Sequence, residues 1–227
     1  MPVAAISFDA AGTFLHFAEP VADTYARFGR QHGLEENASA VRRRMASAFA
    51  SAAPMAPHPD AAVDVHERNW WRRLASQAYG VTENDPGFAR CFDKLFAYFA
   101  RPDAWRVNPD FAALLQGLRN SNMKLAVVSN FDGRLFGLLD AFGLSGLFNH
   151  VILPRHTGSQ KPDPGIFQHA ALALDVQASE LLHLGDHDVE DVAGAKAAGL
   201  QAMQWEFPVE NSDPWRQRLL ARLESND

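Results

Sequence analysis

The sequence has almost no cysteine. Its one thiol, Cys91, excludes an internal disulfide framework and is typical of a protein from a reducing compartment. Cys91 lies among Phe88, Phe92 and Phe96, which belong to the apolar positions of a predicted helix. We therefore expect Cys91 to be a small buried apolar residue rather than a nucleophile.

Long hydrophobic runs and an excess of positive charge are also absent. No run of about 18 apolar residues is available to span a bilayer, and no basic region followed by a long apolar stretch marks a targeting segment. The formal net charge is -6, whereas phosphate backbones require a concentrated basic face. We expect a cytoplasmic protein that binds neither nucleic acid nor a membrane.

The composition is otherwise that of a globular protein with a core. The chain has 227 residues, of which 47% are hydrophobic and 21% charged, enough for one domain that carries a second, smaller one. Residues 16–100 show four helical patterns with no strand between them, whereas residues 1–15 and 101–227 alternate strands with helices. The alternation predicts a doubly wound α/β fold with a parallel, Rossmann-like sheet, interrupted after its first strand by a helical insert.

Apolar runs and helix-breaking residues set the predicted elements. We expect strands at 3–8, 123–128, 148–153, 181–184 and 200–205. We expect helices at 20–32, 37–53, 63–79 and 86–100 in the insert, and at 109–120, 134–142, 165–174, 192–198 and 214–223 in the remainder. The proline-rich segment 54–59 is predicted to be a loop.

Polar residues follow the predicted strands, and the carboxyl ends of parallel strands are where such sheets bind ligands. These residues are Asp9, the pair Ser129-Asn130, Lys161 and Asp186. A carboxylate can attack phosphorus or carbon, and a hydroxyl, an amide and an ammonium can hold phosphoryl oxygens. Two carboxylates that lie close together need a cation or a shared proton, and Mg²⁺ meets that need with oxygen ligands.

The four stretches resemble, in order, the four motifs of the haloacid dehalogenase-like hydrolase superfamily. They are Phe8-Asp9-Ala-Ala-Gly-Thr13, Val128-Ser129-Asn130, Lys161-Pro162-Asp163-Pro164 and Gly185-Asp186-His-Asp-Val-Glu-Asp191. The helical insert lies where members of the superfamily carry a cap. The resemblance implies a hydrolase that acts on a small molecule, with a phosphorylated substrate as our expectation.

The resemblance also implies a role for each motif residue. Asp9 would attack phosphorus and form an aspartyl-phosphate, assisted by Lys161. Phosphoryl oxygens would be bound by Ser129 and Lys161, with Asn130 supporting that loop. Mg²⁺ would be held by Asp9, by the backbone carbonyl of Ala11 and by Asp186, and Asp191 would orient the site from behind these ligands.

Ala11 departs from the superfamily pattern. Most of its phosphatases have an Asp at this position, which protonates the leaving group and activates water. General acid–base catalysis is worth ~10²–10⁴-fold, so its loss leaves about 3–5 kcal/mol of the barrier uncompensated. We expect a preference for leaving groups that need no proton, such as aryl or acyl phosphates, unless another group supplies the proton.

Three other functions stay open at this point. A metal-independent 2-haloacid dehalogenase uses the same nucleophile on carbon, but the acidic fourth motif would repel a carboxylate substrate if no cation were present. A phosphonoacetaldehyde hydrolase shares the Asp9-Ala-Ala11-Gly-Thr13 pattern but needs a cap lysine, and the insert has none before Lys94. A catalytically impaired binding protein of the same fold would have no need to retain Asp9, Lys161 and Asp186.

The insert also carries arginines and aromatic residues. We interpret Arg42-Arg43-Arg44, Arg68 and Arg72-Arg73 as a solvated helix face that can alternatively meet an anionic substrate. Trp70-Trp71 and the phenylalanines between 88 and 99 are interpreted as the core of the insert. His187 is interpreted as a loop residue within reach of substrate, not as a ligand of Mg²⁺.

Overall fold

The computed structural model describes residues 2–34, 37–55 and 62–224. The chain divides into two compact units, one made of Met1–His16 and Arg106–Asp227 and the other of Phe17–Trp105. Of the loop predicted at 54–59, only residues 54 and 55 are described, and neither lies in a helix or strand. None of the helices in the described part of the chain has the length and hydrophobicity that a membrane span requires.

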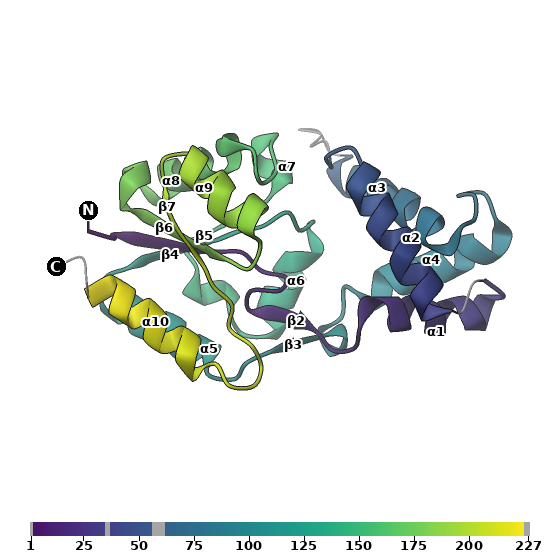
Figure 1. The fold of residues 1–227 in the computed structure, drawn as a ribbon, viewed down its shortest axis with the longest axis horizontal. Helices are drawn as coiled ribbons and strands as arrows, with labels where there is room; N and C mark the ends of the chain where they lie inside the picture. Colours follow the sequence, from purple (N-terminus) through teal and green to yellow (C-terminus); the bar gives the residue numbers. More distant parts are fainter. Residues whose placement is uncertain (1, 35–36, 56–61, 225–227) are drawn as a thin grey trace. The chain divides into compact units, whose positions relative to one another are not determined.

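The first unit is built on a five-stranded parallel sheet (Figure 1), which confirms the predicted α/β doubly wound fold. In spatial order its strands are β5 (His150–Ile152), β4 (Lys124–Val128), β1 (Ala5–Phe8), β6 (Leu181–Gly185) and β7 (Gln201–Gln204). From β1 the chain builds outward through β4 to β5 and then crosses to β6 on the other side of β1. The strand order therefore reverses between β1 and β6, where α/β sheets of this type bind ligands.

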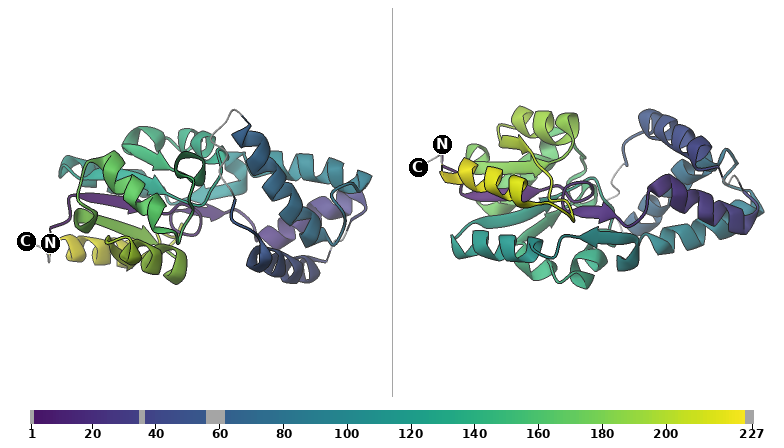
Figure 2. Two further views of the ribbon diagram at one scale, coloured as in Figure 1. Left: turned by 90° about the horizontal axis from the view of Figure 1, so that it is seen from above. Right: turned by 60° about the horizontal axis from the view of Figure 1, so that its bottom comes forward.

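Helices cover both faces of this sheet (Figures 1 and 2). One face carries α8 (Pro164–Leu174) and α9 (Gly194–Ala197), and the other carries α5 (Phe111–Asn120) and α10 (Asp213–Glu224). The first unit also contains α6 (Arg134–Ala141), α7 (Pro154–Thr157) and the single turns η2 (Ser145–Leu147) and η3 (Ala178–Glu180). Because side chains alternate along a strand, each face of the sheet has its own core.

The two cores differ in chemistry. Beneath α8 and α9 the core is mainly aliphatic, with Ala5, Val128, Ile166 and Leu181 among its buried residues beside the ring of Phe167. The opposite face is aromatic: the buried rings of Phe8, Phe14, Phe111, Phe148, Trp205 and Phe207 pack against one another. The ring centroids of Phe14 and Phe111 are 4.6 Å apart in a stacked pair, and those of Phe8 and Trp205 are 5.4 Å apart. Phe8 and Phe14 flank residues 9–13, so this aromatic core anchors both ends of the first motif.

The second unit consists of four helices with their own core. They are α1 (Val21–His32), α2 (Ala38–Ser51), α3 (Val63–Tyr79) and α4 (Pro86–Tyr98), followed by the turn η1 (Pro102–Ala104). Each matches a predicted helix to within two residues at either end, and Gly33 and Gly80 end α1 and α3 as C-caps in the left-handed region. The expected phenylalanine core is present and includes Phe88, Phe92 and Leu95. Cys91 is fully buried within it, and burial raises the pKa of its thiol, as expected for a residue that is not a nucleophile.

Three of the arginines of the insert pack within the unit itself. The Arg68 guanidinium lies 5.0 Å from the Phe92 ring centroid and 2.5 Å from Asp93, and Arg72 lies 5.3 Å from the Phe88 ring centroid. Arg44 donates from Nε to the Ala78 carbonyl. These three side chains therefore contribute to packing between the helices.

Three features of the fold were not predicted. The short strands β2 (Leu15–Phe17) and β3 (Trp105–Val107) pair in a second sheet, and α7 follows β5. The helix predicted at 192–198 begins earlier, because a π-helical turn, η4 (Asp188–Ala193), precedes α9. Segments this short carry too few residues for a periodic pattern, and π-helical turns occur mainly at functional sites rather than following helix propensity.

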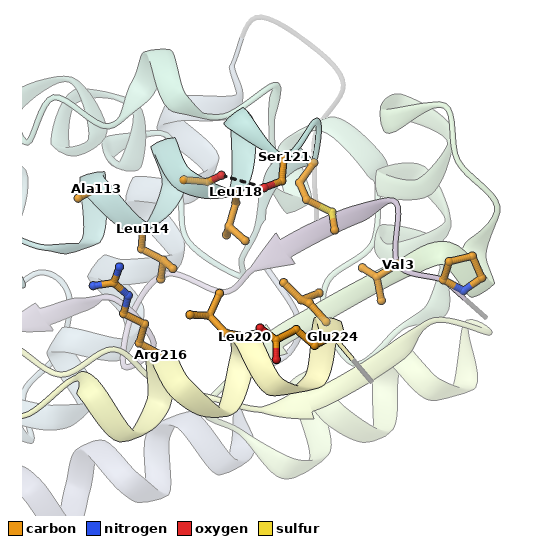
Figure 3. Close-up of a pocket in the computed structure, with 12 residues that line it drawn as sticks. Val3, Ala113, Leu114, Leu118, Ser121, Arg216, Leu220 and Glu224 are labelled. Atoms are coloured by element: carbon orange, nitrogen blue, oxygen red, sulfur yellow. Dashed lines mark hydrogen bonds between the residues drawn. The ribbon is translucent and has the colours of Figure 1, made fainter. Parts of the chain in front are cut away.

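An apolar pocket lies between α5 and α10, at the amino end of β1 (Figure 3). It is lined by Val3, Leu114, Leu118 and Leu220, with Arg216 on its rim. The amino end of β1 is the end remote from Asp9, so this pocket does not belong to the predicted site.

The aromatic core predicts the effect of a single truncation. Phe111, the fully buried first residue of α5, contacts Phe8, Phe14 and Phe207, so Phe111→Ala should lower the free energy of unfolding by about 3–5 kcal/mol. Leu172→Ala in α8 is the control, because this side chain is 79% exposed and should change stability by about 0.5 kcal/mol or less. Urea unfolding followed by far-UV circular dichroism measures both, and equal losses in the two variants would contradict the assigned core.

Candidate active site

The predicted site residues gather at the carboxyl ends of the sheet strands. Asp9 directly follows β1, and its backbone N–H donates to the Leu184 carbonyl of β6 at 2.8 Å. Ser129 follows β4, Lys161 lies between α7 and α8, and Asp186 follows β6. Parallel pairing of β1 with both β4 and β6 places these ends side by side at the reversal of strand order.

Lys161 is the centre of the site. Its side chain is 2% exposed, and its ammonium Nζ lies 2.6 Å from Oδ1 of Asp9 and 2.5 Å from Oδ1 of Asp191. Burial alone lowers the pKa of Lys161, but the charges of Asp9 and Asp191 outweigh this effect and raise the pKa above its ordinary value. The ammonium is therefore charged throughout the neutral range and ties the nucleophile candidate to the fourth motif.

Asn130 fixes the loop that carries Lys161. The Lys161 backbone N–H donates to Oδ1 of Asn130 at 2.8 Å, and Nδ2 of Asn130 donates back to the Lys161 carbonyl at 2.9 Å. Nδ2 also donates to Oε2 of Glu190 at 3.2 Å. Ser129 is buried beside it, and its backbone N–H donates to the Ile152 carbonyl of β5. The amide of Asn130 thus couples the second motif to the third.

The first motif turns sharply after Asp9. Gly12 has a φ of +92°, a value that favours glycine, and a Cβ at this position would lie 2.5 Å from Oδ2 of Asp186. The next residue, Thr13, places its hydroxyl 3.3 Å from Oδ2 of Asp9 and 3.2 Å from Oδ1 of Asp186. Ala11 lies within this turn, where it forms an isolated bridge with Leu15. The missing side chain at position 12 therefore lets the two carboxylates approach the same hydroxyl.

Asp9, Asp186 and Asp191 form a group of carboxylates whose oxygens lie within 4.8 Å of one another. Burial raises the pKa of Asp186, and the charges of Asp9 and Asp191 raise it further. When all are ionised, three carboxylates and one lysine leave two negative charges uncompensated. This charge and these hard oxygen donors fit a divalent cation such as Mg²⁺.

Asp191 is the most deeply buried carboxylate of this group. Burial alone raises its pKa, but the Lys161 charge and the hydrogen bond with His183 outweigh it and hold the pKa of the carboxyl well below its usual range. Its Oδ2 accepts a hydrogen bond from the His187 backbone N–H at 3.0 Å. A Cβ on Gly185 would collide with the Asp191 carboxylate, so glycine at that position makes room for it.

Sequence reasoning missed three residues that contact the site. Thr13 was given no role, although it follows the glycine of the first motif. Glu190 is half-buried in η4, where it bonds to Asn130, and burial raises its pKa. His183 is fully buried in β6, with Nε2 3.1 Å from Oδ1 of Asp191 and Nδ1 2.9 Å from the Ser7 hydroxyl. A histidine within an otherwise apolar strand was the signal that could have identified it.

His187 has a local role in the structure. Its Nδ1 accepts a hydrogen bond from the Glu190 backbone N–H at 3.1 Å, which caps the start of η4. Together with the bond from its own N–H to Asp191, this makes His187 part of the turn that holds the fourth motif.

Solved structures of low sequence identity share this fold. The HAD-hydrolase YfnB from Bacillus subtilis, determined bound to magnesium, is 16% identical and matches with a TM-score of 0.72 over 99% of this chain and 100% of its own. The 2-haloacid dehalogenase from Pseudomonas syringae pv. Tomato DC3000 is 20% identical and matches with a TM-score of 0.65 over 99% of this chain and 100% of its own. At these identities the likeness is one of fold alone.

Sequence comparison is more specific. Haloacid dehalogenase-like hydrolase domain-containing protein 3 from Bos taurus is 32% identical over 200 residues, which cover 87% of this chain and 79% of the relative. The model of the haloacid dehalogenase-like hydrolase family matches residues 3–199, which include all four motifs and the helical unit. The chain therefore belongs to the haloacid dehalogenase-like hydrolases.

Proposed function

We propose that this hydrolase is a Mg²⁺-dependent phosphatase that acts through an aspartyl-phosphate on Asp9. The observation that carries the proposal is the grouping of three carboxylates around one buried lysine at the reversal of strand order. A group with two uncompensated negative charges needs a divalent cation, and a cation beside an aspartate nucleophile suits an anionic phosphoryl group.

The residues present fit the metal that the family motifs imply. Asp9, the backbone carbonyl of Ala11 and Asp186 would hold Mg²⁺, with Asp191 behind them. When bound, the ion neutralises the charge between the carboxylates and the phosphoryl oxygens. The positive φ of Gly12 and the absence of a Cβ at this position support this assignment, because they leave room for the Asp186 carboxylate close to Asp9.

The chemical step begins from the contact between the side chains of Asp9 and Lys161. An Asp9 carboxylate oxygen attacks phosphorus, the bond from phosphorus to the leaving oxygen breaks, and an aspartyl-phosphate results. Lys161, 2.6 Å from the Asp9 carboxylate, offsets charge on the phosphoryl oxygens together with Ser129, while Asn130 holds the Lys161 backbone. Water then attacks the phosphorus of the intermediate and releases phosphate and Asp9.

The leaving group departs in this scheme without a proton from position 11. Ala11 has no acidic hydrogen, so an alcohol must leave as an alkoxide, which is a poor leaving group, whereas a phenol or a carboxylic acid leaves as a stabilised anion. The proposed substrates are therefore small aryl or acyl phosphates. We also propose that the helical unit, inserted between the first and second motifs, acts as the cap that selects among them, and that the enzyme is cytoplasmic, in keeping with its single reduced thiol.

Dehalogenation is the second candidate, because a structural relative carries out that reaction on the same fold. The grouping of Asp186 and Asp191 with Asp9 disfavours it, since a metal-free site would repel the carboxylate of a 2-haloacid. An impaired binding protein is the third candidate, and the intact ion pair between Lys161 and Asp9 disfavours it. The following experiments separate these functions.

Labelling with an acyl phosphate tests the nucleophile. Acetyl phosphate and Mg²⁺ should add one phosphoryl group to the protein, stable in acid and labile in base, and Asp9→Asn should abolish the label because an amide is not a nucleophile. Intact-mass spectrometry measures the adduct, with Asp163→Asn in the third motif as the matched control that should still label. A label that persists in Asp9→Asn would reject the mechanism, and halide release from 2-chloropropionate without Mg²⁺ would favour dehalogenation.

The Ala11→Asp variant tests the missing acid. A carboxyl at this position should raise kcat/KM for an alkyl phosphate by ~10²-fold or more, and should change the value for phenyl phosphate much less because phenol leaves readily. Steady-state assays of both esters with both proteins measure the ratio. Equal rates of the unaltered enzyme on the two esters would show that another group already supplies the proton.

Replacing Asp186 tests the metal site without relying on turnover. Asp186→Asn should weaken Mg²⁺ binding by more than ~10-fold. Substitution of a residue that only supports the ligands typically costs at least this much affinity, and Asp186 is a proposed ligand. Isothermal titration calorimetry measures the affinity, and Asp188→Asn serves as the control because Asp188 is exposed two residues away and lies outside the carboxylate group. Equal Mg²⁺ affinity in the two variants would show that Asp186 is not a ligand of the metal.

A further inference from the structure

A buried polar pair lies in the sheet directly behind the site. Ser7 of β1 and His183 of β6 are partners in the parallel register, and both are 0% exposed. They lie on the face covered by α8, where the Phe167 ring packs edge-on against the imidazole with ring centroids 5.0 Å apart. Neither residue belongs to the four motifs or contacts Asp9 directly.

The contacts of His183 define which nitrogen carries its proton. Its Nε2 lies 3.1 Å from Oδ1 of Asp191, an ionised carboxylate that can only accept. Nε2 therefore donates to Asp191. Burial lowers the pKa of the imidazole and favours its neutral form, so Nδ1, at 2.9 Å from the Ser7 hydroxyl, accepts a hydrogen bond from that hydroxyl. Ser7 thus holds the tautomer and ring orientation that present an N–H to Asp191.

The Asp191 carboxylate links this pair to the reacting groups. Its Oδ1 receives both the His183 N–H and the Lys161 ammonium, and its Oδ2 receives the His187 backbone N–H. Lys161 in turn contacts Oδ1 of Asp9 at 2.6 Å. A continuous chain of hydrogen bonds therefore runs from the sheet interior to the nucleophile candidate, through Ser7, His183, Asp191, Lys161 and Asp9.

The fold itself does not require this chain. The neighbours of His183 in β6, Leu182 and Leu184, are buried and apolar, and a position in such a strand is normally filled by an apolar residue. Two complementary polar groups buried side by side can be replaced by apolar groups of similar shape at little cost in stability. A role at the site therefore explains the pair better than a role in folding.

We propose that His183, held by Ser7, is a positioning residue that orients Asp191 and through it sets Lys161 against Asp9. The inference rests on the proposed function for its effect on turnover, since Lys161 acts there on the phosphoryl group. His183 touches neither the substrate nor the reacting atoms, so its contribution is to geometry.

Two amide substitutions of His183 test the contacts of its two ring nitrogens independently. In His183→Gln the side-chain amide reaches the position of Nε2 and can still donate to Asp191, whereas in His183→Asn the shorter amide reaches only the position of Nδ1, beside Ser7. With phenyl phosphate and saturating Mg²⁺, His183→Asn should lower kcat about 10–100-fold, and His183→Gln should restore most of it. His169→Asn, at an exposed histidine of α8, is the control and should leave kcat unchanged.

Crystal structures of the two variants test the geometry independently of activity. In His183→Asn the Asp191 carboxylate should turn and the Lys161 ammonium should leave hydrogen-bond distance of Asp9, whereas in His183→Gln the contact should persist. A Lys161–Asp9 contact retained in both variants, or equal kcat values for both, overturns the inference. Failure of the unaltered enzyme to hydrolyse any phosphate ester overturns the proposed function instead, while the structures still decide the role of His183.

Discussion

The site depends on one ammonium group buried between two carboxylates. Lys161 has almost no access to solvent, and its charge is stabilised by Asp9 on one side and Asp191 on the other. Breaking a buried ion pair of this kind by removing one partner is costly, because the remaining charge is left uncompensated. The three residues come from three different motifs, so the lysine also holds together segments that are far apart in the sequence.

The lysine does not balance the acidic group by itself. Asp186 stays partly accessible beside Asp9, and its pKa is raised first by burial and then by repulsion from the charges of Asp9 and Asp191. This repulsion is the physical reason that a divalent cation suits the site. It is also the reason that an anionic substrate group does not suit the site when no cation is bound. The excess of negative charge, rather than the fold, distinguishes the candidate reactions, because a magnesium-bound hydrolase and a dehalogenase share this architecture.

Much of the fold could be predicted from the sequence because its signals are local and repeated. Alternating strands and helices indicated the doubly wound sheet, and α3 ends at the predicted residue because Gly80 supplies a left-handed C-cap. The meeting of Asp9 with Lys161 could be predicted from the carboxyl ends of the strands. The contacts of His183 and Thr13 could not, since they depend on register between strands and on rotamers that no local pattern encodes. The π-helical turn η4 likewise has no compositional signal, although it sets the positions of Glu190 and Asp191.

The close packing of Gly12 against Asp186 has a consequence for how such a site can change over evolutionary time. A side chain at position 12 would displace a carboxylate, so this residue is constrained by its neighbours. Position 11 instead carries a methyl group within a turn that is closed by backbone hydrogen bonds from Gly12 to Leu15 and from Thr13 to Ala10. In the proposed mechanism, a carboxyl group at position 11 could therefore be gained or lost while Asp9, the proposed nucleophile, and the neighbouring carboxylates keep their places. If the proposed mechanism holds, reactivity toward poor leaving groups can change through a single codon, without any change in the residues that form and break the covalent bond.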